Sequence, residues 1–200
     1  DAEKMKKVAE ETGRILMVGH LLEYHPAVLK LRAMITSGDL GTINYIYSNR
    51  LNFGKVRTEE NALWSFAPHD VAVILRLIGQ APMEVSACGG SYLTKGIADT
   101  TMSNLRFDND SRAHIFVSWL HPFKEQRLVI VGDKKMAIFN DVVPFGEKLQ
   151  LYPQNVEFEG SIPLLKKEDA EFVEHVNTEP LREECKHFLE CIQSRKQPLT

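Results

Sequence analysis

The stretch Asn61-Ala-Leu-Trp-Ser-Phe-Ala-Pro-His-Asp-Val-Ala-Val-Ile-Leu-Arg-Leu-Ile-Gly79 decides how the rest of the chain can fold. Pro68 suits the first turn of a helix, because its missing N–H would have no partner there. Apolar residues then recur at helical spacing, at Val71, Ile74, Leu75 and Ile78. Gly79 supplies a stop. The pattern predicts a helix that begins at Pro68 and packs one apolar face against a core.

Two proton-handling side chains, His69 and Asp70, fall in the first turn of this predicted helix. The partial positive charge of a helix N-terminus favours Asp70 there and pushes the His69 imidazole toward its neutral form. A neutral imidazole near pH 7 is what a general base requires. The alternative is that Asp70 only caps the helix while His69 points into solvent.

The first twenty residues have the pattern of half an α/β unit. Residues 1–12 read as a helix with Gly13 as its stop, and Arg14–His20 is a short apolar run typical of buried parallel strands. The strand that should precede such a helix is missing. We therefore expect residues 1–20 to be the last helix and strand of a nucleotide-binding domain, and residues 21–200 to form a second domain.

The next segments alternate between a helix, a strand and a loop. His25-Pro26 introduces a predicted helix that closes at the glycines of Ser37–Gly41. Ile43–Asn52 is predicted to be a strand, because it is rich in β-branched and aromatic residues. The polar residues 53–60 are predicted to be an exposed loop that leads to the central helix.

From Pro82 onward the chain reads as a series of strands joined by turns. The predicted strands are 84–93, 100–107, 112–120, 126–131, 136–139 and 148–152. The cationic, aromatic segment Ser118–Arg127 interrupts two of them. It reads either as a long hairpin or as a wall that meets an anionic ligand or a neighbouring subunit.

The last segments are predicted to cover parts of the fold. Residues 153–169 are too apolar for a flexible linker and are expected to pack across a sheet edge. Residues 179–194 form an amphipathic helix whose apolar stripe consists of Leu181, Cys185, Phe188, Leu189 and Ile192.

Helices followed by hairpin-linked strands predict an α+β fold with one large, mostly antiparallel sheet and helices on one face. A helix and strand left from a nucleotide-binding domain would precede it. No predicted segment remains for the other face of the sheet. We therefore expect a homodimer, or a tetramer, through the open sheet face.

Composition excludes several classes of function. The chain is 44% apolar and 26% charged with a net charge of −3, which does not favour nucleic-acid binding. No apolar run approaches the roughly 20 residues of a membrane span. Cys88, Cys185 and Cys191 have no metal or redox spacing, and the odd count fits reduced thiols in a cytoplasm.

Motifs for cofactors and metals are missing. The sequence lacks G-x-G-x-x-G, H-E-x-x-H, C-x-x-C and G-x-S-x-G. Four histidines could converge with Asp70 on a metal, but their spacing matches no tight site, so we expect no metal. They are His20, His25, His69 and His121.

Over almost all of its length, the chain resembles the C-terminal part of the Gfo/Idh/MocA family of oxidoreductases. It is most similar to members that act at C3 of UDP-linked N-acetyl sugars or their uronic acids. The order and spacing of several short motifs carry the resemblance. They are Gly19–Pro26, Ser37–Gly41, Trp64–Asp70, Ile97–Thr100, Ser118-Trp119 with Val131–Lys134, and Glu179–Arg182.

The resemblance implies a division of labour between two domains. In the family, an N-terminal Rossmann domain holds NAD or NADP, and an E-K-P segment supplies a catalytic lysine. The C-terminal sheet supplies the substrate pocket and the oligomer interface. A histidine at the start of the mid-chain helix lies by the reacting carbinol, and His69 matches it.

Two departures from the family pattern matter. Many relatives carry aspartate four residues before that histidine, where this chain has Ser65. Serine cannot hold a negative charge, so an acid–base pair would have to use Asp70 or a water. The Rossmann half and its lysine are absent, so no cofactor-binding residue is expected within these 200 residues.

The leading hypothesis is the substrate-binding and oligomerisation part of an NAD(P)-dependent oxidoreductase acting on a sugar or nucleotide sugar. The candidate catalytic residues are His69 and Asp70. The candidate substrate-binding residues are Tyr24, His25, Asn49, Arg50, Lys55, Arg57, Ser65 and His121. Their cations would suit a diphosphate or carboxylate. Each of these residues also has a plain surface or strand interpretation.

Two alternatives come from other classes of protein. The chain alone would be a non-catalytic, oligomeric ligand-binding or scaffold module if no cofactor domain accompanies it. A metal-dependent hydrolase or isomerase would need the histidines to converge on an ion.

Overall fold

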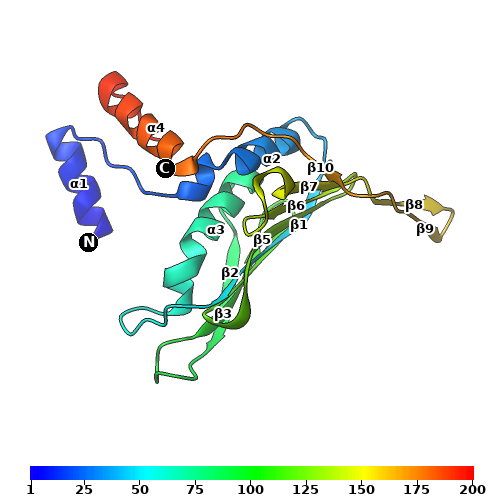
Figure 1. Ribbon diagram of the computed structural model, residues 1–200, viewed down its shortest axis with the longest axis horizontal. Helices are drawn as coiled ribbons and strands as arrows, with labels where there is room; N and C mark the ends of the chain where they lie inside the picture. The colour runs from blue at the N-terminus through cyan, green and yellow to red at the C-terminus, as the bar shows by residue number, and fades with distance from the viewer.

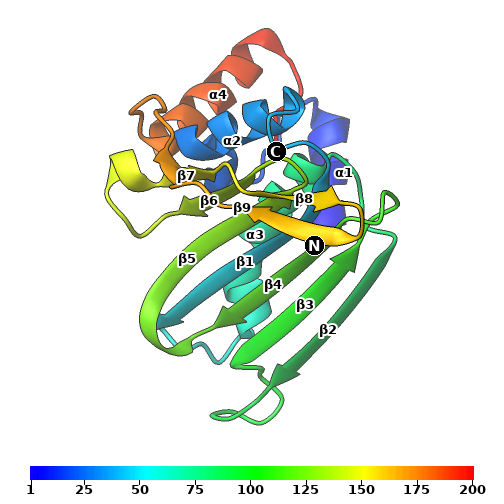
Figure 2. The same cartoon turned by 90° about the vertical axis from the view of Figure 1, so that its right-hand side faces the viewer.

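One eight-stranded sheet with helices on one face organises the fold, as the computed structural model of residues 1–200 shows (Figures 1 and 2). The strand order is β10-β7-β6-β5-β1-β4-β3-β2. Only β1 and β4 pair in parallel. Helices α2 (Pro26–Thr36) and α3 (Ala62–Ile78) cover one face. These features confirm the predicted α+β fold.

The sheet is built from strands of very different length. Their bounds are β1 Ile43–Phe53, β2 Glu84–Gly90, β3 Thr100–Arg106, β4 Arg112–Ser118, β5 Leu120–Gly132, β6 Met136–Asn140, β7 Leu149–Tyr152 and β10 Glu171–Phe172. The core lies between this sheet and the two helices. Leu31, Ile46, Ile74, Ile115 and Ile130 are almost fully buried there. Each such side chain contributes about 1.5–3 kcal/mol through burial.

The predicted break at Ser118–Arg127 is wrong. Strand β1 lies between β4 and β5, so the latter two do not form a hairpin. Ser118 at the end of β4 pairs with Leu51, while Leu120 at the start of β5 pairs with Phe53. Only Trp119 separates the two strands. Leu120 and residues 125–127 pair with β1, which offers hydrogen bonds on both of its edges, and an irregularity in the register separates the two sets of pairs.

A buried hydrogen-bond cluster fixes this crossing point. The Trp119 indole N–H donates to Asp99 over 2.6 Å, and the backbone N–H groups of Tyr92 and Leu93 donate to the other Asp99 oxygen. Burial raises the pKa of Asp99, but these three hydrogen bonds outweigh burial and hold it below its ordinary value. The sequence motifs around Asp99 and Trp119 are therefore joined by one buried hydrogen-bond cluster.

The central helix begins earlier than predicted. Asn61 caps α3 by accepting a hydrogen bond from the Trp64 N–H (3.1 Å), and Pro68 lies inside the helix. The apolar stripe extends upstream through the buried Ala62 and Ala67, so tertiary packing outweighs the one hydrogen bond that Pro68 removes. His69 consequently lies mid-helix, and the helix-dipole argument for its neutral form does not apply.

The predicted strand at residues 14–20 does not form. Helix α1 (Ala2–Thr12) ends at Gly13 (φ 61°) as expected, but none of its residues is buried. The segment after it is extended and has no strand beside it. Its Val18 N–H instead contacts the carbonyl oxygen of Thr200 at 3.4 Å. Figure 1 shows α1 standing apart from the sheet.

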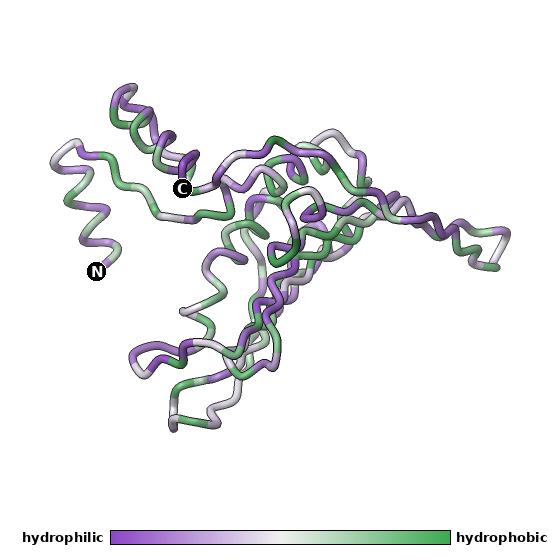
Figure 3. Tube along the Cα trace, viewed as in Figure 1, coloured by the Kyte–Doolittle hydropathy of each residue, from purple (hydrophilic) through white to green (hydrophobic).

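Residues 153–169 do not pack across a sheet edge as predicted. They form a two-stranded hairpin, β8 (Asn155–Glu159) and β9 (Ile162–Lys166), that projects from the molecule (Figure 1). Its Val156, Phe158 and Leu165 are 48%, 69% and 66% exposed. Figure 3 shows apolar stretches along this projecting segment.

Helix α4 (Pro180–Ser194) forms where expected, but the other face is buried. Leu181 and Leu189 of the predicted apolar stripe are exposed, whereas Glu184 and Cys191 are buried near the short helix η1 (Leu21–Tyr24). A second short helix, η2 (Phe145–Glu147), precedes β7. No helix in the chain is both long and apolar enough for a membrane span.

Candidate functional site

The site centres on His69, half-buried in the middle of α3. Its ring meets the His20 ring edge-on, with 5.8 Å between centroids and an angle of 89°. Its Nδ1 atom is buried without a hydrogen-bond partner. Burial lowers the pKa of His69, Arg50 and His20 lower it further, and Asp70 opposes them. The neutral imidazole expected from the sequence is thus favoured, but for a different physical reason.

The Asp70 side chain forms its hydrogen bonds with residues of β1 and not with the His69 ring. Arg50 donates through Nε (2.6 Å) and a terminal nitrogen (3.2 Å), and the Ser48 hydroxyl donates over 2.7 Å. Asp70 is only 5% exposed. The bidentate pair ties α3 to β1 and thereby sets the height of His69 above the sheet. Both carboxylate oxygens of Asp70 already accept a hydrogen bond from Arg50, so neither is available to His69.

The loop between β1 and α3 places the Arg57 guanidinium beside the helix turn that precedes His69. Arg57 donates to the Ser65 hydroxyl over 3.1 Å and pairs with Glu60 at 3.0 Å. Ser65 lies one turn before His69, so the two side chains share a helix face. Lys55 is exposed in the same loop. The structure therefore groups Arg57, Ser65 and His69, with Lys55 on the loop next to them.

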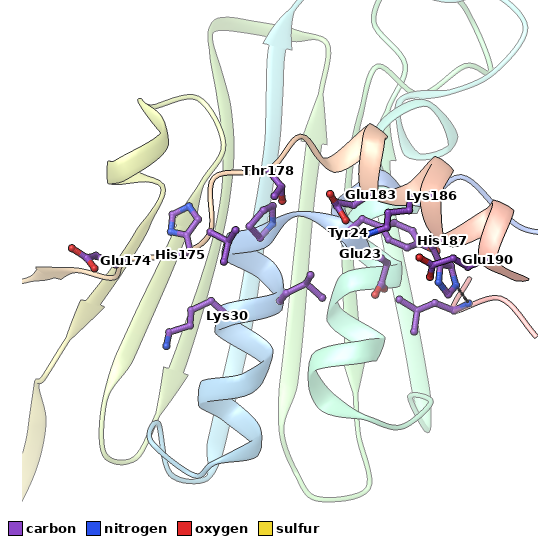
Figure 4. Close-up of a pocket in the computed structure, with 14 residues that line it drawn as sticks. Glu23, Tyr24, Lys30, Glu174, His175, Thr178, Glu183, Lys186, His187 and Glu190 are labelled. Carbon is purple, nitrogen blue, oxygen red and sulfur yellow. Dashed lines mark hydrogen bonds between the residues drawn. The ribbon is translucent and has the colours of Figure 1, made fainter.

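Two of the other sequence-predicted residues lie at a separate cavity or in the core. Tyr24 is buried in η1, with its hydroxyl 3.3 Å from Thr200, beside a cavity of about 720 Å³ between α2 and α4 (Figure 4). His25 caps α2 by accepting from the Ala27 N–H (3.1 Å). Burial lowers the pKa of His25 to about 4. His25 therefore acts as a neutral helix cap.

Asn49 and His121 are also away from His69. Asn49 alternates with Ser48 and Arg50 along β1, so it lies on the open sheet face, where it donates to Glu125 over 3.0 Å. The His121 ring packs on Phe123 at 4.4 Å near the start of β5. Neither side chain contacts the His69 group.

His20 is the site residue that sequence reasoning missed. The sequence marks it only as a possible metal ligand, yet its ring packs against the His69 ring and also lines a groove of about 900 Å³ between α3 and strands β2–β4. Trp64, Pro68 and Arg76 line that groove with it. The available signal was its place in the Gly19–Pro26 motif. Nowhere do three His, Cys, Asp or Glu side chains come together as a metal site.

The match to a family model identifies the class of this domain. The model of the GFO/IDH/MocA C-terminal domain matches residues 28–138, from α2 to β6. The chain belongs to the Gfo/Idh/MocA family.

Relatives of known name are distant. The 2,7-anhydro-N-acetylneuraminate hydratase of Mediterraneibacter gnavus is 24% identical over 166 residues, covering 76% of this chain and 44% of that protein. The UDP-N-acetylglucosamine 3-dehydrogenase of Acidithiobacillus ferrooxidans is 24% identical over 197 residues, covering 98% of this chain and 59% of that protein. This chain thus spans roughly half the length of these relatives.

Solved structures share the fold. The UDP-N-acetylglucosamine 3-dehydrogenase of Acidithiobacillus ferrooxidans superposes with a TM-score of 0.77 at 24% identity, over 98% of this chain and 60% of that one. The aldose–aldose oxidoreductase of Caulobacter crescentus gives 0.77 at 16% identity, over 99% and 59%. At these identities the superpositions establish the fold alone.

Proposed function

We propose that this chain is the substrate-binding part of an NAD(P)-dependent dehydrogenase that acts on a hydroxyl of a sugar or nucleotide sugar. One observation carries the proposal. His69 is half-buried, its environment favours the neutral form, and no side chain or backbone group of the chain hydrogen-bonds to its ring. Such an imidazole is suited to take the proton of a substrate hydroxyl. The names of the relatives support the substrate class.

The neighbouring residues have complementary tasks in this proposal. Arg57 and Lys55 hold an anionic group of the substrate, a diphosphate or a carboxylate. The Arg50–Asp70 pair fixes α3 under His69. A nicotinamide cofactor, when bound, accepts the hydride. No glycine-rich turn precedes a helix in this chain, so we assign no residue here to the cofactor.

We also propose that residues 1–20 belong to a nucleotide-binding domain and residues 21–200 to the substrate domain. Helix α1 buries no side chain, and Leu16 and Val18 in the following segment are exposed. Apolar side chains on such a segment normally pack against another unit.

The free cysteines, including the exposed Cys88, fit a reducing cytoplasm.

We propose that copies of the chain associate through the open sheet face. Tyr45 and Met102 on that face are 40% and 47% exposed. The β8–β9 hairpin stands out from the same side (Figures 1 and 2). Register places Val156 opposite Leu165 and Phe158 opposite Pro163, so one hairpin face is wholly apolar. An isolated two-stranded ribbon is only marginally stable in water, which favours a partner for that face.

The double variant Phe158→Asp/Leu165→Lys is expected to weaken self-association, because it places charges on the apolar hairpin face. Sedimentation velocity should show a smaller species than the wild type at equal concentration. Glu157→Gln, on the opposite hairpin face, is the control and should leave the sedimentation coefficient unchanged. A monomeric wild type, or a double variant that still assembles, would rule out this interface.

Binding of a nucleotide sugar tests the substrate class. Calorimetric titration of this chain with UDP-N-acetylglucosamine, or its uronic acid, should give heat of binding. Arg57→Ala should weaken it about 10-fold, equivalent to about 1.4 kcal/mol for a lost charged contact. Arg112→Ala, on the exposed sheet face, is the matched control.

The outcomes separate the candidate functions. Binding that depends on Arg57 supports the substrate domain. Absence of binding with every sugar nucleotide supports the alternative, a non-catalytic scaffold module. Binding of NAD(H) to this chain alone would contradict our assignment of no cofactor residue to it.

A further inference from the structure

Three buried polar atoms without partners belong to the candidate base and to two residues behind it. They are Nδ1 of His69, Nδ1 of His20 and Oε1 of Glu184. The two imidazoles touch edge-on. The carboxylate oxygen lies 3.7 Å from the position that a Cβ on Gly19 would occupy, next to His20. Buried polar atoms are normally paired, so such a cluster requires a physical explanation.

Glu184 stands out among the buried carboxylates. Four carboxylates in the chain are buried. Glu23 pairs with Arg76, Asp70 pairs with Arg50, and Asp99 accepts three N–H groups. No ion pair or hydrogen bond compensates Glu184, which is only 7% exposed. A buried unpaired charge is costly, and the adjacent base able to offset it is His20.

No neighbour of His69 offers an unpaired negative charge of the kind that Glu184 offers to His20. Ser65 carries no charge, and Asp70 is already neutralised by Arg50. Nothing adjacent to His69 can therefore draw a proton away from it. The Glu184 carboxylate, which lies beyond His20, attracts a proton to His20 instead.

We propose that Glu184 and His20 form a proton-accepting pair that protects His69 on acidification. The first proton to enter the cluster settles on His20 beside the Glu184 carboxylate, and His69 stays a free base. This inference rests on the proposed role of His69 as the base. Glu184 and His20 are positioning residues in this scheme, because they act on the substrate only through His69.

The electrostatics of the neighbouring elements agree with this order. His20 faces Glu184 from α4 and His69 from α3, and it shares a groove with Glu23, Arg32 and Arg76. Tyr24 of η1 also faces Glu184. Burial lowers the pKa of His20 below its ordinary value, and Glu184 offsets only part of that effect. For His69, burial lowers the pKa first, then Arg50 from β1 and then His20, against Asp70. A charge on His20 therefore disfavours a second charge on His69.

The test is an NMR titration of the histidine ring signals in the 200-residue chain, from about pH 8 down to about pH 4.5, across the range where imidazoles titrate. His20→Asn and His69→Asn identify the two signals. In Glu184→Gln, the pKa of His20 should fall and that of His69 should rise. In His20→Asn, the pKa of His69 should also rise, and adding Glu184→Gln should change it no further.

Glu190→Gln is the matched control, because Glu190 is exposed on the same helix. It should move neither signal. An unchanged or lowered pKa of His69 in Glu184→Gln would overturn the proposal. If the amide spectrum shows that Glu184→Gln does not fold, His20→Asn decides alone, and an unmoved His69 signal would refute the coupling.

This readout requires neither substrate nor cofactor. If the histidine pKa values shift as predicted but His69→Asn keeps full turnover, the proposed function is rejected and the proton-accepting pair is retained. If His69→Asn loses turnover but the pKa values do not shift as predicted, the pair is rejected and the proposed function is retained.

Discussion

Replacing His69 by asparagine in the complete protein should lower kcat of the proposed dehydrogenase reaction by about 10²–10⁴-fold, the usual contribution of a general base. Asparagine keeps a polar side chain of similar reach but cannot take a proton at neutral pH. Binding of the sugar nucleotide should change much less, since Arg57 and Lys55 remain. Steady-state kinetics with the sugar nucleotide and NAD(P), together with calorimetric affinities, separate the two effects.

The pH profile adds a second readout for the same variant. Burial, Arg50 and His20 together hold the pKa of His69 below its ordinary value of 6.5. Wild-type kcat/KM should therefore stay level through neutral pH and fall only on the acid side, as His69 becomes protonated. The variant should lack that acid limb.

His114→Asn is the control for His69→Asn. His114 is exposed on the open sheet face and hydrogen-bonds to Asn104. It should leave kcat unchanged. Full activity in His69→Asn would show that another group removes the hydroxyl proton.

Asp70→Ala should destabilise the fold by about 3–5 kcal/mol, because it leaves Arg50 as a buried charge without its partner. The Arg50 and Asp70 side chains are 13% and 6% exposed, so water cannot replace the lost carboxylate. Urea unfolding of the chain, followed by circular dichroism, measures the change in free energy of unfolding.

Two further variants show whether the pair itself is responsible. Asp70→Leu combined with Arg50→Met removes both charges and should recover most of the loss. Glu157→Ala breaks the exposed Lys166–Glu157 pair and should cost less than about 1 kcal/mol. If Asp70→Ala cost no more than Glu157→Ala, the bidentate pair would not be what ties α3 to the sheet.

Local signals in the sequence predicted most elements but not their partners. The Pro26 start of α2, the Gly79 stop of α3 and the strand at residues 43–52 depend on near neighbours in the chain, and all three are confirmed. The start of α3 was misplaced because Pro68 is a strong local signal that distant core contacts overrule. The Ser118–Arg127 break was wrong because a strand from far upstream separates β4 from β5.

The candidate site shows the same division. His69 was identifiable from one motif, and Arg57 and Ser65 lie close to it in sequence. The partners of Asp70 come from β1, and the neighbours of His20 come from α3 and α4, so no local pattern could pair them. Tyr24 and His25 lie beside His20 in sequence, yet they are directed to a different cavity and to the core.

The single residue between β4 and β5 constrains the order in which the sheet can assemble. In β1, Ile46 pairs with Ala113 on one edge and with Ile130 on the other. During synthesis, β1 therefore emerges long before either of its neighbours exists. The β2–β3–β4 meander joins segments close in sequence and can assemble without β1. β1 therefore has no strand partner until β4 and β5 exist, and it is the segment most in need of protection from aggregation in a nascent chain.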